Sequence, residues 1–243
     1  MTRGPRTTSR DASGRRAVVN SEPVRSAFAF DLEQLELQVE VMTLKVDRAL
    51  DVSTQVLLEG DLRLAQQVLA GDDAIDDMSV SLTERCYDLL CRQNPVASDL
   101  RLVVSVLRIV QDLERTGDLC LRIVKLAPDH HLLVASPHTF AILRDMAEEA
   151  KSLFELAARA WAARDLRLGR SLEHRDDAMD RHNARLMEAI LHLEGPSAVP
   201  QAVTTLLAGR ALERIADHSV MMGERLRYML TGDVESLSKE VGP

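Results

Sequence analysis

Two short stretches of the chain carry acidic residues in one pattern. "DLERTGD" at 112–118 and "ALERIAD" at 211–217 both read Leu-Glu-Arg-x-x-Asp, which pairs Glu114 with Asp118 and Glu213 with Asp217. Residues four apart lie on one face of a helix, so each stretch is expected to present two neighbouring carboxylates. Such a pair can help to hold a metal cation, or it can form ion pairs with arginine and lysine.

A second set of acid pairs lies earlier in each half of the chain. "DLRLAQQVLAGDDAIDD" at 61–77 and "DLRLGRSLEHRDDAMDR" at 165–181 are identical at 8 of 17 positions. They contain the pairs Asp72/Asp76 and Asp176/Asp180. Acids four apart are common in a chain with 38 Asp and Glu, so the spacing alone is weak evidence. The four pairs stand out because they occupy equivalent positions of an internal duplication, with offsets of 104 and 99 residues.

The two glutamates of the Leu-Glu-Arg stretches interrupt apolar helix faces. In the first half, the stripe that leads to Glu114 consists of Leu100, Val103, Leu107 and Val110. In the second half, the stripe that leads to Glu213 consists of Val199, Ala202, Leu206 and Gly209. Like charges on a partly buried face are destabilising unless a cation neutralises them. A metal ion held by oxygen ligands from two helices fits this need, and buried or rim salt bridges remain the alternative.

The elements that would position these acids are helices. Apolar periodicity is helical from Ala27 onward, and breakers such as "EGD", "QNPVAS" and "EGPSAVP" divide the chain. Aromatic residues make up only 3%, which favours helix packing over sheets. We therefore predict an all-α fold of two tandem three-helix bundles, with helices at about 27–58, 62–93, 97–127, 137–163, 166–193 and 198–230. The predicted domains are a disordered basic tail (1–26), a first repeat (27–128), a second repeat (136–232) and a flexible C-terminus (233–243).

Composition excludes several classes of protein. The net charge of −8 argues against a nucleic-acid partner. The chain contains no run of 18 apolar residues, so we predict no membrane span. The three cysteines are expected to be buried thiols in a reducing compartment. The chain has no Ser-His-Asp or Cys-His arrangement, P-loop or dinucleotide fingerprint, so catalysis is not expected. A ferritin-type di-metal oxidase would need Glu-x-x-His, which does not occur.

The motifs together resemble one known family. "GDDAID", "QNPVASDLR", "DLERTGD", "RDDAMD" and "ALERIADHS" are similar to the PhoU family, the cytoplasmic regulators of phosphate uptake, from about residue 28 to 232. The resemblance implies a non-catalytic protein that connects the phosphate-specific ABC transporter to a membrane sensor histidine kinase. Such proteins damp phosphate uptake and phosphate-starvation signalling when phosphate is plentiful.

The resemblance also implies metal clusters on the acidic motifs. One cluster would use Asp72, Asp76, Glu114 and Asp118, and the other would use Asp176, Asp180, Glu213 and Asp217. Carboxylate ligands alone do not distinguish iron from zinc, manganese or magnesium. We expect a homodimer that is cytoplasmic and reaches the inner face of the membrane only through its partners.

The second half departs from the family pattern at several positions. Ala216 stands where Gly117 stands in the first copy, and Arg175 precedes Asp176 where an acid is common. The second site is therefore expected to bind metal more weakly or not at all. His218 follows Asp217 and is a minor candidate ligand. A purely structural helical adapter whose acids form salt bridges remains the alternative function, and no Gly-rich cradle or arginine cluster in the sequence indicates a phosphate pocket.

Overall fold

The computed structural model describes residues 21–93 and 95–234, and every regular element within these ranges is helical. In chain order the elements are α1 (Ser21–Glu59), α2 (Leu62–Gln93), α3 (Ser98–Val124), the 3₁₀ turn η1 (Ala127–Asp129), α4 (His130–Val134), α5 (Pro137–Ala163), α6 (Leu166–Leu191) and α7 (Ala198–Thr231).

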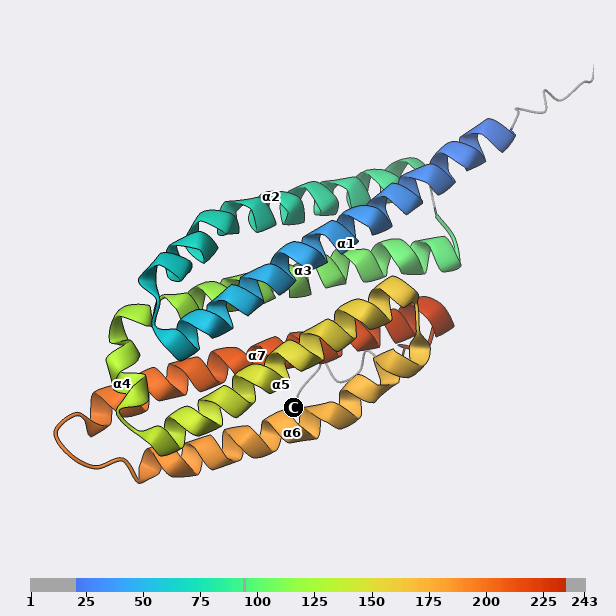
Figure 1. Cartoon of the computed structure of the whole chain (residues 1–243). Coiled ribbons are helices and arrows are strands. Elements are labelled where there is room, and N and C mark those ends of the chain that lie inside the picture. The colour runs from blue at the N-terminus through green and yellow to red at the C-terminus, as the bar shows by residue number, and fades with distance from the viewer. Residues whose placement is uncertain (1–20, 94, 235–243) are drawn as a thin grey trace, which may run out of the picture.

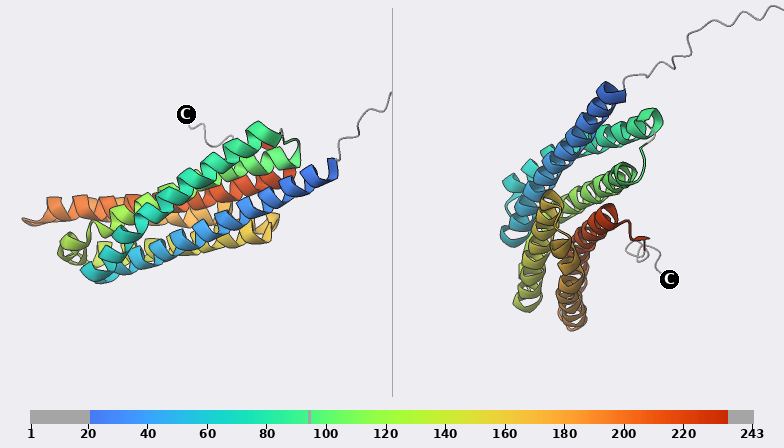
Figure 2. Two further views of the ribbon diagram at one scale, coloured as in Figure 1. Left: turned by 90° about the horizontal axis from the view of Figure 1, so that it is seen from above. Right: turned by 90° about the vertical axis from the view of Figure 1, so that its right-hand side faces the viewer.

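The helices form two bundles that lie against each other (Figure 1). Helices α1, α2 and α3 pack as one bundle, and α5, α6 and α7 pack as the other. The bundles meet mainly where α3 packs on α7, with a smaller contact between α1 and α5. Figure 2 shows the same stacking from two further directions. The predicted all-α fold of two three-helix bundles is confirmed.

Two boundaries differ from the sequence-based expectation. Helix α1 already includes residues 21–26 of the predicted tail. The junction between the repeats folds into η1 and α4 instead of a plain turn, and the His130 ring contacts the backbone carbonyl of Leu58 at 3.2 Å. The rest of the predicted tail (1–20) and residues 235–243 of the predicted C-terminus lie outside the described residues.

The two "DLRL" segments begin α2 and α6 with the same cap. The carboxylates of Asp61 and Asp165 each accept hydrogen bonds from the backbone N–H groups two and three residues later. These bonds hold the pKa of each carboxyl group below its usual value, and the bond from the N–H group two residues later has the largest effect. The "DLRL" sequence that the two repeats share therefore encodes a helix start.

Helices α3 and α7 run antiparallel, and hydrogen bonds fix their register. The Arg101 guanidinium donates to the carbonyl of Met229 at 3.3 Å, and the Ser105 hydroxyl donates to the carbonyl of Arg225 at 3.4 Å. Helix α3 also packs on α1 and α2, so it is the most central helix of its bundle, as its apolar circumference predicts.

Glycines allow close helix contacts within each bundle. A Cβ atom added to Gly223 of α7 would lie 2.9 Å from the carbonyl oxygen of Gly169 and 2.7 Å from Cδ1 of Leu172, both on α6. In the first bundle, a Cβ on Gly117 of α3 would lie 3.4 Å from the Ile75 side chain of α2. The second and third helices of each repeat, which carry the acid pairs, are therefore held close together.

The cysteines are free thiols, and their environments differ. Cys86 and Cys120 are buried, and burial raises the pKa of each thiol to about 12. Cys91 is exposed, which corrects the prediction that all three would be buried. The buried stripe of α2 runs through Leu82, Cys86 and Leu89, and Cys91 lies only two residues beyond it, on another face of the helix.

Candidate metal centre

In the first repeat, α2 and α3 bring their acid pairs into one electrostatic environment. Burial raises the pKa of Asp72, and the charges of Asp76 and Asp118 raise it further. Burial also raises the pKa of Glu114, followed by the charges of Asp118, Asp76 and Asp72. Each helix contributes two carboxylates four residues apart, so the four acids share the surface between α2 and α3.

One arginine partly compensates this cluster from its own helix. Arg115 of α3 lies 3.6 Å from the Glu114 carboxylate and 3.3 Å from the Asp118 carboxylate. Its side chain is 61% exposed, so these ion pairs are screened by water. Lys125 acts more weakly, as the last of the charges that bear on the pKa of Asp72. The first cluster therefore keeps an excess of negative charge.

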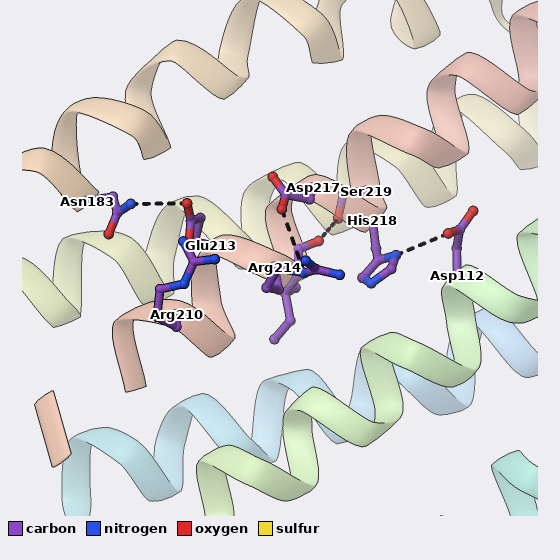
Figure 3. A network of polar contacts seen from close by, with 9 residues as sticks. Asp112, Asn183, Arg210, Glu213, Arg214, Asp217, His218 and Ser219 are labelled. Carbon is purple, nitrogen blue, oxygen red and sulfur yellow. Dashed lines mark hydrogen bonds and ion pairs between the residues drawn. The ribbon is translucent and has the colours of Figure 1, made fainter. Parts of the chain in front are cut away.

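The second repeat places its acids in a more cationic setting (Figure 3). The Glu213 carboxylate forms an ion pair with Arg210 and accepts a hydrogen bond from the Asn183 amide at 3.1 Å. Burial raises the pKa of Glu213, and Arg210 opposes that rise. Asp217 lies 3.9 Å from the Arg214 guanidinium, and burial likewise raises its pKa.

The acid pair of α6 is only partly joined to that of α7. The charge of Asp180 raises the pKa of both Glu213 and Asp217, so it faces the same surface. Asp176 is half-buried one turn earlier on α6. Arg175, the departure noted in the sequence, turns to α5, where it contacts Glu149 at 3.2 Å and Ser152 at 3.0 Å.

The donor atoms have not converged on a common point in either repeat. In the described part of the chain, no three His, Cys, Asp or Glu side chains are placed so that they could hold one metal ion as they stand. The first cluster nevertheless has the donor chemistry of an oxygen-ligated cation site. It contains four carboxylates, two from α2 and two from α3, and one arginine from α3. In the second cluster, Arg210 and Arg214 already supply the positive charge that a metal would bring.

His218 belongs to a buried polar contact between the repeats and not to the acid cluster. Its Nδ1 atom lies 3.1 Å from the Asp112 carboxylate of α3, and both side chains are 9% exposed (Figure 3). The Arg225 guanidinium lies 3.9 Å from the same carboxylate. We call Asp112, His218 and Arg225 the polar seam.

Sequence reasoning overlooked Asp112, although the repeat contained a signal. At the equivalent positions, with the 99-residue offset, Asp112 corresponds to Ala211, and His218 corresponds to Leu119. Each of the two residues that form this contact is therefore polar, whereas its equivalent in the other copy is apolar. A comparison of the repeats would have marked Asp112 and His218 as positions where the copies differ, although not as partners of each other.

Two copies of one acidic three-helix unit, packed through their third helices, define a class of duplicated all-α protein with acid pairs on its second and third helices. The PhoU domain model matches residues 39–127 and 143–226, which are the two bundles. The chain belongs to the PhoU family.

Relatives of known sequence and structure agree with this assignment. The phosphate-specific transport system accessory protein PhoU homolog 1 of Mycobacterium tuberculosis is 36% identical over 188 residues, which cover 76% of this chain and 84% of that protein. The crystal structure of PhoU from Pseudomonas aeruginosa superposes with a TM-score of 0.79 at 30% identity, covering 85% of this chain and 100% of that one. The phosphate transport system regulatory protein PhoU from Streptococcus pneumoniae gives a TM-score of 0.75 at 25% identity, covering 85% of this chain and 98% of that one.

Proposed function

We propose that the protein regulates phosphate homeostasis by contact and not by turnover. In this proposal it lowers phosphate uptake and phosphate-starvation signalling by binding the phosphate ABC transporter and its sensor histidine kinase from the cytoplasmic side. Membership of the PhoU family supports the proposal, and so do the relatives, which are named as accessory and regulatory proteins of phosphate transport. None of the described helices is long and apolar enough to cross a membrane.

We further propose that metal binds the first acid cluster. Asp72, Asp76, Glu114 and Asp118 would hold it, with iron, zinc, manganese or magnesium as candidates. The observation that carries this proposal is that α2 and α3 each contribute two carboxylates to the surface between them, where burial and then the neighbouring acids raise the pKa of Asp72 and Glu114. A bound cation would supply the missing positive charge and join α2 to α3. The second cluster would bind metal more weakly, because Arg210 already pairs with Glu213.

The regulatory role is tested with a reporter of a phosphate-starvation promoter. In cells grown at high phosphate, deletion of the gene should raise expression, and Glu114→Ala/Asp118→Ala should raise it while most helical content remains. The matched control is Asp73→Ala/Asp77→Ala, which removes two exposed acids from α2 with the same spacing. A promoter that stays silent in the deletion strain, with the transporter intact and no close paralogue present, would contradict the regulatory proposal.

Elemental analysis of the purified protein tests the metal proposal separately. Wild-type protein should contain metal, Glu114→Ala/Asp118→Ala should lose most of it, and the Asp73→Ala/Asp77→Ala control should retain it. If wild-type protein purified without chelators holds no metal, even after incubation with each candidate ion, the acids act through salt bridges alone. That outcome would favour the structural helical adapter, and a promoter response could still be present.

A further inference from the structure

A cationic cavity lies where the two repeats meet. It has a volume of about 640 Å³ and is formed by α3 on one side and α7 on the other. Its charged lining consists of Arg115 and Arg122 from α3, Lys125 directly after the end of α3, Arg210 and Arg214 from α7, and a single acid, Asp118. Five cations against one carboxylate make an unusual surface in a chain whose net charge is −8.

Only some of these cationic side chains form ion pairs with acids. Arg115, Arg210 and Arg214 form ion pairs with acids of their own helices. Within residues 21–93 and 95–234, the Arg122 and Lys125 side chains have neither a hydrogen-bond partner nor an ion-pair partner. Both are exposed and line the cavity one helical turn apart. The cavity therefore offers two free cationic groups beside three that are already oriented.

The chemistry of the lining selects phosphate groups. Arginine presents a planar fork of N–H donors that matches phosphate oxygens, and lysine adds a compact point charge. From Arg115 to Lys125 the cations of α3 extend over about 15 Å at the rise of an α-helix. That length exceeds what one phosphate ion can contact, and the volume is that of a small-molecule site. Linked phosphate groups match this row of cations better than a single phosphate does.

We propose that the α3–α7 cavity binds a small anion that carries two or more linked phosphate groups. Arg122 and Lys125 make its principal contacts, and Arg210 and Arg214 face it from the second repeat. Leu119, Leu207 and Ala211 form apolar walls, so an organic group attached to the phosphates is accommodated as well. The site stands on its own geometry and does not depend on the regulatory role or on metal at the acid cluster.

Isothermal titration calorimetry on the chelator-treated full-length protein tests the proposal, with inorganic phosphate, tripolyphosphate and ATP as probes. Tripolyphosphate should bind saturably at one site per chain and more tightly than inorganic phosphate. Arg122→Gln/Lys125→Gln should weaken its binding at least about tenfold, since even one lost charged contact contributes about that factor. ATP carries the same number of phosphate groups, so tighter binding of ATP would identify an organic phosphate as the ligand, and equal or weaker binding an inorganic one.

The matched control removes the same charge from another surface. Arg63→Gln/Arg167→Gln alters two repeat-equivalent arginines whose side chains are 91% and 93% exposed and which do not line the cavity. It should leave tripolyphosphate affinity within about twofold of wild type, because distant exposed charges are screened. The proposal is overturned if tripolyphosphate shows no saturable binding, if both double variants weaken it equally, or if inorganic phosphate binds as tightly as tripolyphosphate. These outcomes are independent of the promoter response.

Discussion

Removing Asp112 from the polar seam should destabilise the whole protein. The Asp112 and His218 side chains are each 9% exposed, and a hydrogen bond of 3.1 Å joins them. A hydrogen bond to a charged group contributes about 1.5–3 kcal/mol. Asp112→Ala also leaves the Arg225 guanidinium, 3.9 Å away, without that carboxylate. We expect a loss of about 2–4 kcal/mol in the free energy of unfolding, below the full cost of breaking a tight buried ion pair.

The repeat itself supplies the partner variant for a double-mutant cycle. His218→Leu combined with Asp112→Ala installs on this side the Ala–Leu combination that Ala211 and Leu119 form on the other. An apolar pair leaves neither member of the lost hydrogen bond unsatisfied, so the double variant should be more stable than the sum of the single variants predicts. The expected coupling is about 1–2 kcal/mol, within the range for residues in contact.

Urea unfolding with two probes measures these effects. Far-ultraviolet circular dichroism follows all helices, and fluorescence of Trp161, the chain's single tryptophan, follows the second bundle. The two transitions should coincide in the wild type and shift together in Asp112→Ala, because the seam joins the bundles. A loss below about 0.5 kcal/mol in Asp112→Ala, which is the size of an ordinary surface effect, or full additivity in the cycle would refute the reasoning.

Three further expectations follow from single positions. Only Cys91 should react with a thiol reagent in the native protein at neutral pH, since the other two thiols are buried with a pKa of about 12; labelling before and after unfolding checks this. Because the pKa of Asp165 is lowered in the folded state, its ionised form stabilises the fold above the unfolded pKa. That stability is lost as pH falls through the folded pKa, so Asp165→Asn should flatten the acid side of a plot of urea midpoint against pH. Gly223→Ala should cost about 1–3 kcal/mol in urea unfolding through overpacking, whereas Gly71→Ala, with open space around its Cβ, should be neutral or stabilising.

The helices and their duplication could be predicted because both are local properties of the sequence. The 3.6-residue period identifies a helix from its own residues, and the shared "DLRL" start reappears as the same cap in α2 and α6. The four acid pairs were found in the same way. The pKa shifts of Asp72 and Glu114 show what the sequence could only suggest, that carboxylates from two helices act on each other.

The contacts between the repeats could not be predicted, because they depend on the register of α3 against α7. Asp112 and His218 are 106 residues apart, and neither carries a local sign of its partner. The cavity could not be predicted from the sequence for the same reason. Arg122 and Arg210 look like ordinary solvated helix residues in the sequence, and only antiparallel packing places them on one cavity. The junction helix α4 was missed because five residues are too few for a periodic pattern.

The duplication also has an evolutionary consequence at the contact between α3 and α7. If two identical three-helix units had met there as separate chains, every residue on one side of the symmetry axis would have appeared again on the other. Within a single chain that constraint does not hold, because each copy can change alone. In this chain Asp112 and His218 form a polar contact, whereas the equivalent Ala211 and Leu119 are apolar and line the cavity, which His218 also borders. One of two equivalent contacts between the repeats thus joins the halves of the chain through polar groups, and its apolar counterpart borders a cavity that a ligand could occupy.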